Sequence, residues 1–337
     1  MKLGDAQRVT LNRFLGCMVG LAAGDALGAP VEFASREEIL AAHGPQGLRD
    51  FIAWGGHPAG SFTDDTQMSL ATAEGCIRAY QHVHARGAVH PAAIVWRRYK
   101  EWMRTQRDPS QQRAPGQTCL SALRSSRMPT VELLPNSSKG CGAVMRAASI
   151  GLAYAPAEAF KTGLECGVLT HGHPSGYLPA GYLAALVAFI VSGLPVSDAV
   201  AQALPLLQGH EGHEDTAARV REAVRLAGSP IAAHEAIERL GAGWTGDEAL
   251  GIGVLCALRH QEDFREGVIL AVNHSGDSDS TGCIAGAILG TLLGFSAIPK
   301  TWVLDLEDSR RIQKVAVDLY RVARGGEELS RDEYPPE

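Results

Sequence analysis

The chain has 337 residues, of which 45% are hydrophobic, 20% charged and 6% aromatic, and its formal net charge is -6. This apolar content excludes a disordered chain, and neither a collagen nor a coiled-coil repeat is present. The acidic balance, without a long basic run, argues against nucleic-acid binding through a broad positive surface. A composition rich in Ala, Gly and Leu favours packed helices over a β-sandwich.

The cysteines and the apolar stretches bear on where the protein works. The seven cysteines are scattered and form no C-x-x-C pair, which argues against a disulfide framework or a zinc site and fits a reducing cytosol. Polar residues interrupt the N-terminal segment, so no signal peptide is predicted. The most membrane-like stretch, 282–299, is short and diluted by Gly, Thr and Ser, and it predicts a buried core helix. We therefore expect a cytoplasmic protein outside the membrane and, without a heptad pattern, a monomer.

Helical patterns follow one another along nearly the whole chain. Helices are expected at 11–29, 35–43, 63–80, 90–106, two or three times between 145 and 193, and at 196–207, 213–227, 229–240, 245–260, 280–296 and 305–323. No segment is typical of a β-strand, and no linker divides the chain. The sequence thus predicts an all-α fold, a single compact domain of orthogonal helices over residues 1–324, followed by a charged, frayed tail at 325–337.

Glycine recurs at every fourth position in two of these helices. One series is Gly16, Gly20, Gly24 and Gly28, and the other is Gly282, Gly286, Gly290 and Gly294. Each series forms a bare stripe along one helix face, where another backbone can approach closely. Because each Gly costs about 1 kcal/mol of helix propensity relative to Ala, we expect close packing of central helices to compensate.

Acidic and hydroxyl side chains gather ahead of two helices. The segments 61–66 (Ser-Phe-Thr-Asp-Asp-Thr) and 276–281 (Gly-Asp-Ser-Asp-Ser-Thr) have this pattern, and Asp25 and Glu32 lie at the end of the first glycine-rich helix. Helix N-capping alone explains most such sequences, although one cap needs only one residue. If the two segments meet, four carboxylates share one site and require protonation or a cation. Oxygen donors without His or Cys point to a two-cation site for Mg²⁺, with Mn²⁺ or Ca²⁺ as alternatives.

Five motifs in this order resemble the ADP-ribosylglycohydrolase family, whose founding bacterial members remove ADP-ribose from an arginine of dinitrogenase reductase. The resemblance covers roughly residues 12–295. Each motif alone is weak, and the ordered set carries the resemblance. The motifs are Gly-x-x-x-Gly-Asp-Ala-Leu-Gly-x-Pro-x-Glu at 20–32, Thr-Asp-Asp-Thr at 63–66, Gly-Cys-Gly-Ala-Val-Met-Arg at 140–146, Thr-His-Gly-His-Pro at 170–174 and Gly-Asp-Ser-Asp-Ser at 276–280.

The resemblance implies an all-α fold with a binuclear Mg²⁺ centre at the bottom of a central cleft for ADP-ribose. Mn²⁺ is the possible substitute. Ser280 stands where many members have Thr and keeps a hydroxyl oxygen, which leaves Thr281 as a cap or core residue. The residues that match the family's metal ligands are Thr63, Asp64, Asp65, Asp277, Asp279 and Ser280.

The same resemblance implies the remaining site residues. Glu32 matches a position on a mobile flap near the scissile bond, and Asp25 is expected to brace that loop. Asp64 and Asp279 could position the attacking water, and Glu32 could handle a proton or the acceptor. Ligand contacts are implied for Glu32, for His171 and for a loop around the diphosphate and ribose made of Ser138, Lys139, Gly140, Cys141, Gly142 and Ala143.

Several further residues keep two interpretations. His173 is either a ligand contact or a satisfied loop histidine. Arg146 pairs either with a phosphate or with a buried acid. Cys141 stands where several relatives carry Asn, which puts a side-chain contact to the ligand in doubt there. Tyr177, Tyr182, Trp244 and Phe264 are core candidates, of which one could stack on adenine.

The function expected from the resemblance is Mg²⁺-dependent hydrolysis that removes ADP-ribose from an acceptor, with protein ADP-ribosylarginine as the leading substrate. Other acceptors are ADP-ribosylserine, a modified base or a small molecule. A second hypothesis is an immunity partner of an ADP-ribosylating toxin, which acts by hydrolysis, by occlusion of a cognate ADP-ribosyltransferase, or by both. A third is a catalytically silent ADP-ribose-binding module.

Overall fold

The computed structural model describes residues 4–335, and within them it contains helices and no β-strand, as the sequence predicted. Four short 3-10 turns, η1 to η4, lie at Ala29–Val31, Pro109–Gln111, Cys141–Ala143 and Phe295–Ala297. The helices are α1 (Asp5–Gly28), α2 (Arg36–His43), α3 (Asp64–Arg86), α4 (Pro91–Thr105), α5 (Gln117–Leu123), α6 (Ala148–Ala153), α7 (Pro156–Val168), α8 (Pro174–Val191), α9 (Val196–Gln208), α10 (Glu214–Ala227), α11 (Ala233–Leu240), α12 (Gly246–Arg259), α13 (Phe264–Val272), α14 (Ser278–Leu293), α15 (Lys300–Asp305) and α16 (Ser309–Gly325).

The expected helices all form, and three further helices were not predicted. These are α5, α13 and α15, which have seven, nine and six residues. Such short segments carry too few turns for a helical period to stand out. A local signal did exist for α13, because the side chain of Asp263 accepts a hydrogen bond from the backbone N–H of Glu266 and caps the helix.

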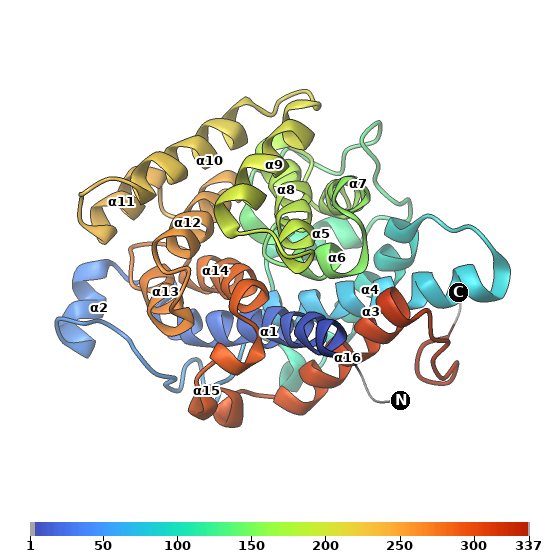
Figure 1. Ribbon diagram of the computed structural model, residues 1–337, viewed down its shortest axis with the longest axis horizontal. Coiled ribbons are helices and arrows are strands. Elements are labelled where there is room, and N and C mark those ends of the chain that lie inside the picture. Colours follow the sequence, from blue (N-terminus) through green and yellow to red (C-terminus); the bar gives the residue numbers. More distant parts are fainter. Residues whose placement is uncertain (1–3, 336–337) are drawn as a thin grey trace.

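The two glycine stripes face each other at the centre of the molecule, where α1 and α14 pack antiparallel (Figure 1). A Cβ atom added to Gly24 would lie 1.9 Å from the carbonyl oxygen of Gly282, and one added to Gly20 would lie 2.4 Å from that of Gly286. The backbones are therefore in direct contact. This is the close packing that was expected to compensate for the low helix propensity of the glycines. This packing brings the C-terminal end of α1 beside the N-terminal end of α14.

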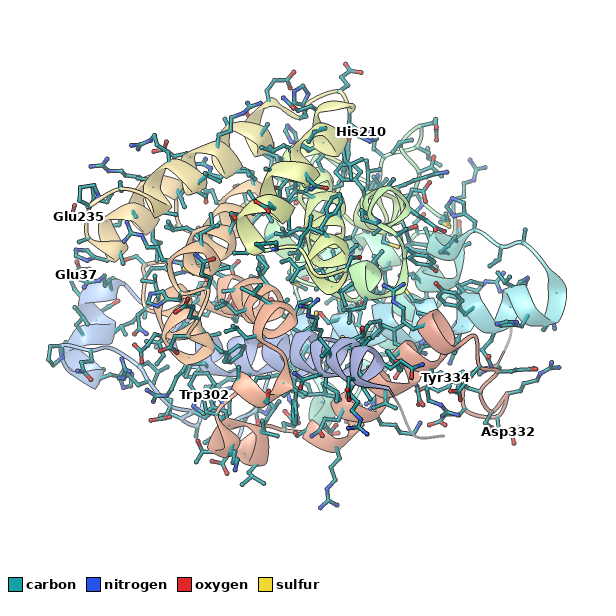
Figure 2. The ribbon with its side chains drawn as sticks, viewed as in Figure 1. Glu37, His210, Glu235, Trp302, Asp332 and Tyr334 are labelled. Atoms are coloured by element: carbon teal, nitrogen blue, oxygen red, sulfur yellow. The ribbon has the colours of Figure 1, made fainter. Side chains whose placement is uncertain are left out.

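Several other helices pack against this pair. In Figure 1, α9, α10 and α11 run along one edge of the molecule, while α15 and α16 lie along the opposite edge. Helices α12 and α13 pack on α14, and α16 packs on both α1 and α3. Figure 2 shows the side chains of Glu37, Glu235 and Asp332 on the periphery, where all three are exposed.

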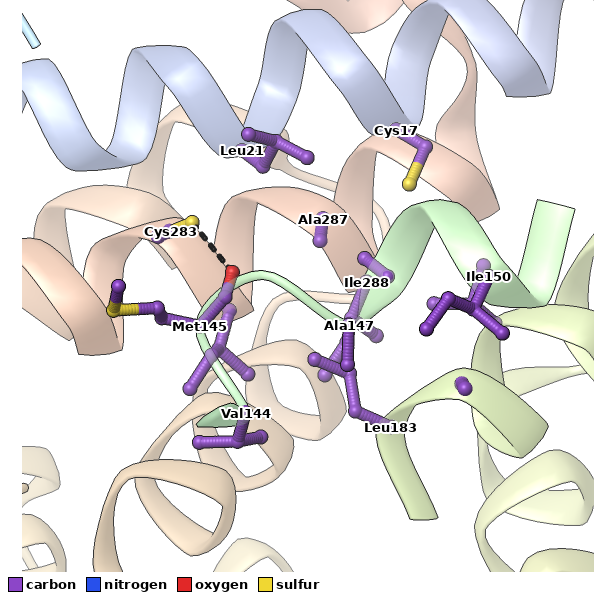
Figure 3. Close-up of a cluster of buried hydrophobic side chains, with 14 of the residues drawn as sticks. Cys17, Leu21, Val144, Met145, Ala147, Ile150, Leu183, Cys283, Ala287 and Ile288 are labelled. Carbon is purple, nitrogen blue, oxygen red and sulfur yellow. Dashed lines mark hydrogen bonds between the residues drawn. The ribbon is translucent and has the colours of Figure 1, made fainter. Parts of the chain in front are cut away.

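A buried cluster joins the central pair to the segment that follows η3 (Figure 3). Leu21 of α1 and Leu183 of α8 are both completely buried there. The thiol of Cys283 on α14 donates a hydrogen bond to the carbonyl oxygen of Met145, with a separation of 3.2 Å. The segment after η3 is thus attached directly to the helix that carries the second acidic motif.

The C-terminal segment 325–335, which the sequence predicted to be a frayed tail, is largely exposed but is attached to the fold at Leu329 and Tyr334. The side chain of Gln81 exchanges two hydrogen bonds with the backbone of Leu329, at 2.8 and 3.1 Å. The Tyr334 hydroxyl donates to the Asp318 carboxylate at 3.0 Å, and both aromatic ring and carboxylate are buried. The side chains of Leu329 and Tyr334 are therefore buried in this charged stretch, and the hydrogen bonds attach it to α3 and α16. Residues 336 and 337 of the predicted tail lie outside the described residues.

Two helices are long and apolar enough to cross a membrane by length and composition. They are α1 with its η1 extension, Asp5–Val31, and α8. In the fold 89% and 83% of their apolar windows are buried, which is the burial of core helices. The stretch singled out from the sequence, 282–299, falls mainly in α14, which is buried over most of its length as predicted.

Candidate active site and metal centre

The first acidic motif is held at the N-terminus of α3 by a buried aspartate of α1. Thr63 is the N-cap residue, and its hydroxyl accepts a hydrogen bond from the N–H of Asp65. The Asp25 carboxylate accepts from the N–H of Thr63 and from both the N–H and the hydroxyl of Thr66, at 2.5 to 3.1 Å. Asp25 therefore braces the turn at the start of α3, whereas from the sequence it was expected to brace the loop that carries Glu32.

The second acidic motif forms the N-terminus of α14 and meets the first. Asp277 is the N-cap residue, with its carboxylate near the N–H of Ser280. The Ser280 hydroxyl donates to the Asp65 carboxylate at 2.9 Å, which joins two motifs separated by 215 positions. The two helix N-termini thus converge, and their free N–H groups favour negative charge between them. Thr281 instead bonds the Asp277 carbonyl and the His274 ring, in keeping with its predicted cap or core role.

A cleft of about 170 Å³ opens onto these acids. Segment 114–119, which includes Ala114 with its positive φ of 53°, forms one wall. The Gly116 N–H in this wall donates to the Asp64 carboxylate at 3.2 Å. The predicted site residues that line the cleft are Glu32, Asp64, Asp65, Gly140, Cys141, Gly142, His171, Asp277, Asp279 and Ser280.

The carboxyl groups of the cleft are buried and lie close enough together to raise one another's pKa. Burial, and then the charges of Asp279 and Asp277, raise the pKa of Glu32 to about 10. Burial also raises the pKa of Asp64 to about 8, against the hydrogen bond from Gly116. The pKa of Asp65 is raised well above its usual range by the same burial, followed by the charge of Asp279. Without a cation, these carboxyl groups can be accommodated only by taking up protons.

The donor set fits a hard cation such as Mg²⁺. Carboxylate and hydroxyl oxygens meet in one buried cleft, and such oxygens are the ligands that Mg²⁺ prefers. In the described part of the chain, no three His, Cys, Asp or Glu side chains form a ready-made cage for an ion. The support for a metal comes instead from the mutual repulsion of buried carboxylates, which a divalent cation would relieve. Thr63 does not line the cleft. Burial raises the pKa of Asp279, and a hydrogen bond from the nearby Thr63 hydroxyl is one of several that oppose this rise.

The loop expected to hold a ligand contributes three of its six residues to the cleft. Ser138, Lys139 and Ala143 do not line it, and Lys139 instead borders a separate pocket of about 430 Å³ with Asp215. Two N–H groups of the loop are already used, since Gly140 donates to the Ser138 hydroxyl and Cys141 to the Trp244 carbonyl. The Cys141 thiol donates to the Asp277 carboxylate at 2.8 Å. This cysteine therefore faces the acids.

His171 closes the cleft behind the loop glycines. A Cβ atom added to Gly140 would lie 3.2 Å from its Nε2 atom, and one added to Gly142 would lie 3.0 Å from its Cε1 atom. The ring is 2% exposed, and burial, followed by the positive charge of Arg146, lowers its pKa to about 3. The ring is therefore neutral in the cleft. His173 instead caps α8 by accepting from the Ser175 N–H, which matches the interpretation as a loop histidine.

Arg146 is held by neutral partners and does not line the cleft. Its side chain is buried, and its partners are the Tyr99 hydroxyl, the Thr170 hydroxyl and the Gly142 carbonyl. No acid pairs with it among the described residues. These partners come from separate elements, so no local pattern could indicate them.

An aromatic pair at the cleft mouth was also missed. Phe33 adopts a positive φ of 69°, is 74% exposed and stacks on Trp244 at 5.1 Å between ring centroids. Since Trp244 is 40% exposed, it is no core residue, whereas Tyr182 and Phe264 are buried as expected. The pair connects the turn that carries Glu32 to the segment beside Cys141. The other unpredicted lining residues are Met145, which lies in the motif at 140–146, and Ala114, Gly116, Gln117, Thr118 and Cys119, which belong to no motif.

The fold and the cleft define a class, an all-helical domain with a buried oxygen-donor site between two helix N-termini. The family model for ADP-ribosylglycohydrolases matches residues 6–328, and the chain belongs to this family. It is 29% identical to the ADP-ribosyl-(dinitrogen reductase) glycohydrolase of Rhodospirillum rubrum over 322 residues, covering 93% of this chain and 97% of that protein. It is 26% identical to the ADP-ribosylarginine hydrolase Tri1 of Serratia proteamaculans over 332 residues, covering 93% and 80%.

A solved structure has the same fold. It is described as an ADP-ribosylglycohydrolase-related protein complex, and its chain is 26% identical to this one with a TM-score of 0.68. The match covers 94% of this chain and 99% of that chain. The likeness therefore extends over the whole domain, including the helices that carry the two acidic motifs.

Proposed function

We propose that the protein is a Mg²⁺-dependent hydrolase that releases ADP-ribose from a modified acceptor. The observation that carries the proposal is the hydrogen bond between Ser280 and Asp65, because it brings both acidic motifs to one cleft. A catalytically silent module would have no need to keep several carboxylates buried together, since this arrangement costs stability without a cation. Membership of the family supports the same reaction class.

The position of each residue in the cleft suggests its role in metal binding or in the reaction. Asp64, Asp65, Asp277, Asp279 and Ser280 would hold the metal, with Thr63 behind them. When bound, Mg²⁺ supplies positive charge that offsets the carboxylates and orients oxygen ligands. The bond to the ribose anomeric carbon breaks through a transition state of oxocarbenium character, which nearby carboxylates stabilise. Asp64 or Asp279 orients the attacking water, and Glu32 holds a proton at the cleft mouth, where the acceptor leaves.

We propose that the acceptor of the ADP-ribose is an arginine side chain of the substrate protein. The relatives support it by their descriptions, since one is an ADP-ribosylarginine hydrolase and another acts on ADP-ribosyl-dinitrogen reductase. Glu32 lies in the turn beside the cleft, and once it has given its proton to the departing group, its carboxylate suits the resulting guanidinium by charge. The partner would then be an ADP-ribosylated protein in the cytoplasm.

A hydrolysis panel tests this function. Purified protein is incubated with peptides that carry ADP-ribose on arginine or on serine, with Mg²⁺, with Mn²⁺ or with EDTA, and released ADP-ribose is measured. The proposal expects release from arginine that EDTA abolishes and Mg²⁺ restores. Release from serine alone would overturn the arginine assignment. Binding of ADP-ribose without release from any acceptor would favour a binding module, and occlusion of a transferase that survives Asp64→Asn would favour an immunity partner.

A further inference from the structure

A buried chain of hydrogen bonds leads from Arg146 to the histidine of the cleft. The Nη2 atom of Arg146 donates to the Thr170 hydroxyl oxygen at 2.6 Å, and this oxygen lies 2.8 Å from the Nδ1 atom of His171. All three residues are at most 2% exposed. The backbone is fixed as well, because the Thr170 carbonyl accepts from the Asn136 side chain at 2.8 Å.

The direction of each bond follows from the chemistry of the groups. A guanidinium has donors and no acceptor, so the Thr170 oxygen must accept from Arg146 and keeps one proton of its own to donate. That proton can go to His171 Nδ1 or to the Cys119 sulfur, which also lies within reach of the Thr170 hydroxyl. An imidazole nitrogen is the stronger acceptor, since thiol sulfur accepts weakly. Thr170 therefore donates to Nδ1.

This direction determines where the histidine carries its own proton. A neutral imidazole whose Nδ1 atom accepts a hydrogen bond bears its hydrogen on Nε2. The Nε2 edge lies beside Gly140 in the cleft lining, and no protein acceptor for it is found among residues 4–335. A side chain at position 140 would press on this edge, so glycine keeps it accessible.

We propose that Thr170, held by Arg146, is a positioning residue that fixes His171 as the Nε2–H tautomer, which presents a neutral hydrogen-bond donor to an oxygen of the ligand. The part about the ligand rests on the function proposed above, whereas the part about the tautomer does not. His171 then acts as a donor to a phosphate or hydroxyl oxygen of ADP-ribose. It has no role as a base, because the Nε2 atom that faces the cleft already carries a hydrogen and has no free lone pair to accept another.

The tautomer can be read directly by long-range ¹H–¹⁵N NMR of the full chain labelled at histidine, with His171 assigned from the signals lost in His171→Asn. We expect a protonated Nε2 and an unprotonated Nδ1 in the wild type and in Thr170→Ser. In Thr170→Val, which keeps the shape and loses the hydroxyl, we expect the proton to redistribute toward Nδ1. A wild-type Nδ1–H signal would overturn the proposal even if the valine variant did not fold, and so would an unchanged spectrum of that variant.

Calorimetry with free ADP-ribose tests the ligand part on the same proteins. The loss of one oriented donor weakens binding by about tenfold in Thr170→Val, whereas Thr170→Ser should stay within about twofold of the wild type. An altered tautomer with unchanged affinity would overturn the ligand contact. Absence of ADP-ribose binding by the wild type would overturn the proposed function and the ligand part with it, and the NMR result would then still decide the tautomer.

Discussion

The Ser280 hydroxyl donates a hydrogen bond to the Asp65 carboxylate and thereby joins the N-terminus of α14 to that of α3. The glycine contacts between α1 and α14 set the position of the first of these two ends. Asp25, at the end of α1, then accepts hydrogen bonds from the backbone of Thr63 and Thr66 and holds the second. Helix packing at the centre of the fold thus places the acidic cleft.

Removal of a single carboxylate tests whether the cleft works through a cation. In Asp64→Asn and in Asp279→Asn we expect ADP-ribose release to fall by roughly a hundredfold at fixed Mg²⁺, because each change removes a charged oxygen donor. The concentration of Mg²⁺ needed for a half-maximal rise in melting temperature should increase in parallel. Asp332→Asn, at an exposed position on the tail, is the matched control. Wild-type rates in both cleft variants at saturating Mg²⁺ would exclude the metal-centred mechanism.

Those features of the fold and the site that depend on short stretches of sequence could be predicted. The capped acidic motifs and the glycine stripes are local, so helices with polar ends were expected at 63–80 and 280–296, and they form at 64–86 and 278–293. The sequence did not predict that the two stripes face each other. A glycine at every fourth position shows that another backbone approaches the helix, but it does not show which helix that backbone belongs to. The wall at 114–119 was missed for a related reason, since its link to Asp64 is a backbone N–H of Gly116.

The central glycine contacts predict a strong effect of one methyl group. Gly24→Ala would place a Cβ atom 1.9 Å from the Gly282 carbonyl oxygen, so the two helices must move apart. We expect a loss of about 3 kcal/mol in the free energy of unfolding and weaker Mg²⁺ binding, because the same helices carry the acids. Gly228→Ala is the control, since its Cβ would meet no atom closer than 4.0 Å and its φ is -85°. Chemical denaturation of both variants measures the difference, and equal stabilities would show that the stripes tolerate separation.

The buried carboxyls predict how pH acts on the metal-free protein. The folded-state pKa values of Asp25 and Asp64 are raised to about 7 and about 8, above the value of about 4 for an unfolded aspartate. The folded state therefore binds more protons, and its stability falls as pH rises from about 4 to about 8. In EDTA the melting temperature should decrease from pH 5 to pH 8, and added Mg²⁺ should raise it more at pH 8 than at pH 5. An equal rise in melting temperature with Mg²⁺ at pH 5 and at pH 8 would contradict the view that a cation relieves the repulsion between the buried carboxylates.

The stacking of Phe33 on Trp244 predicts coupled effects on catalysis at the cleft mouth. Phe33→Ala removes the stack that ties the Glu32 turn to the segment beside Cys141, so we expect the rate of ADP-ribose release to fall by about tenfold with Mg²⁺ binding unchanged. Trp244→Ala should have the same effect, and the double variant should be no slower than either single one, because both remove one contact. Leu304→Ala, at another exposed apolar residue, should leave the rate unchanged. Additive losses in the double variant would show that the two rings act separately.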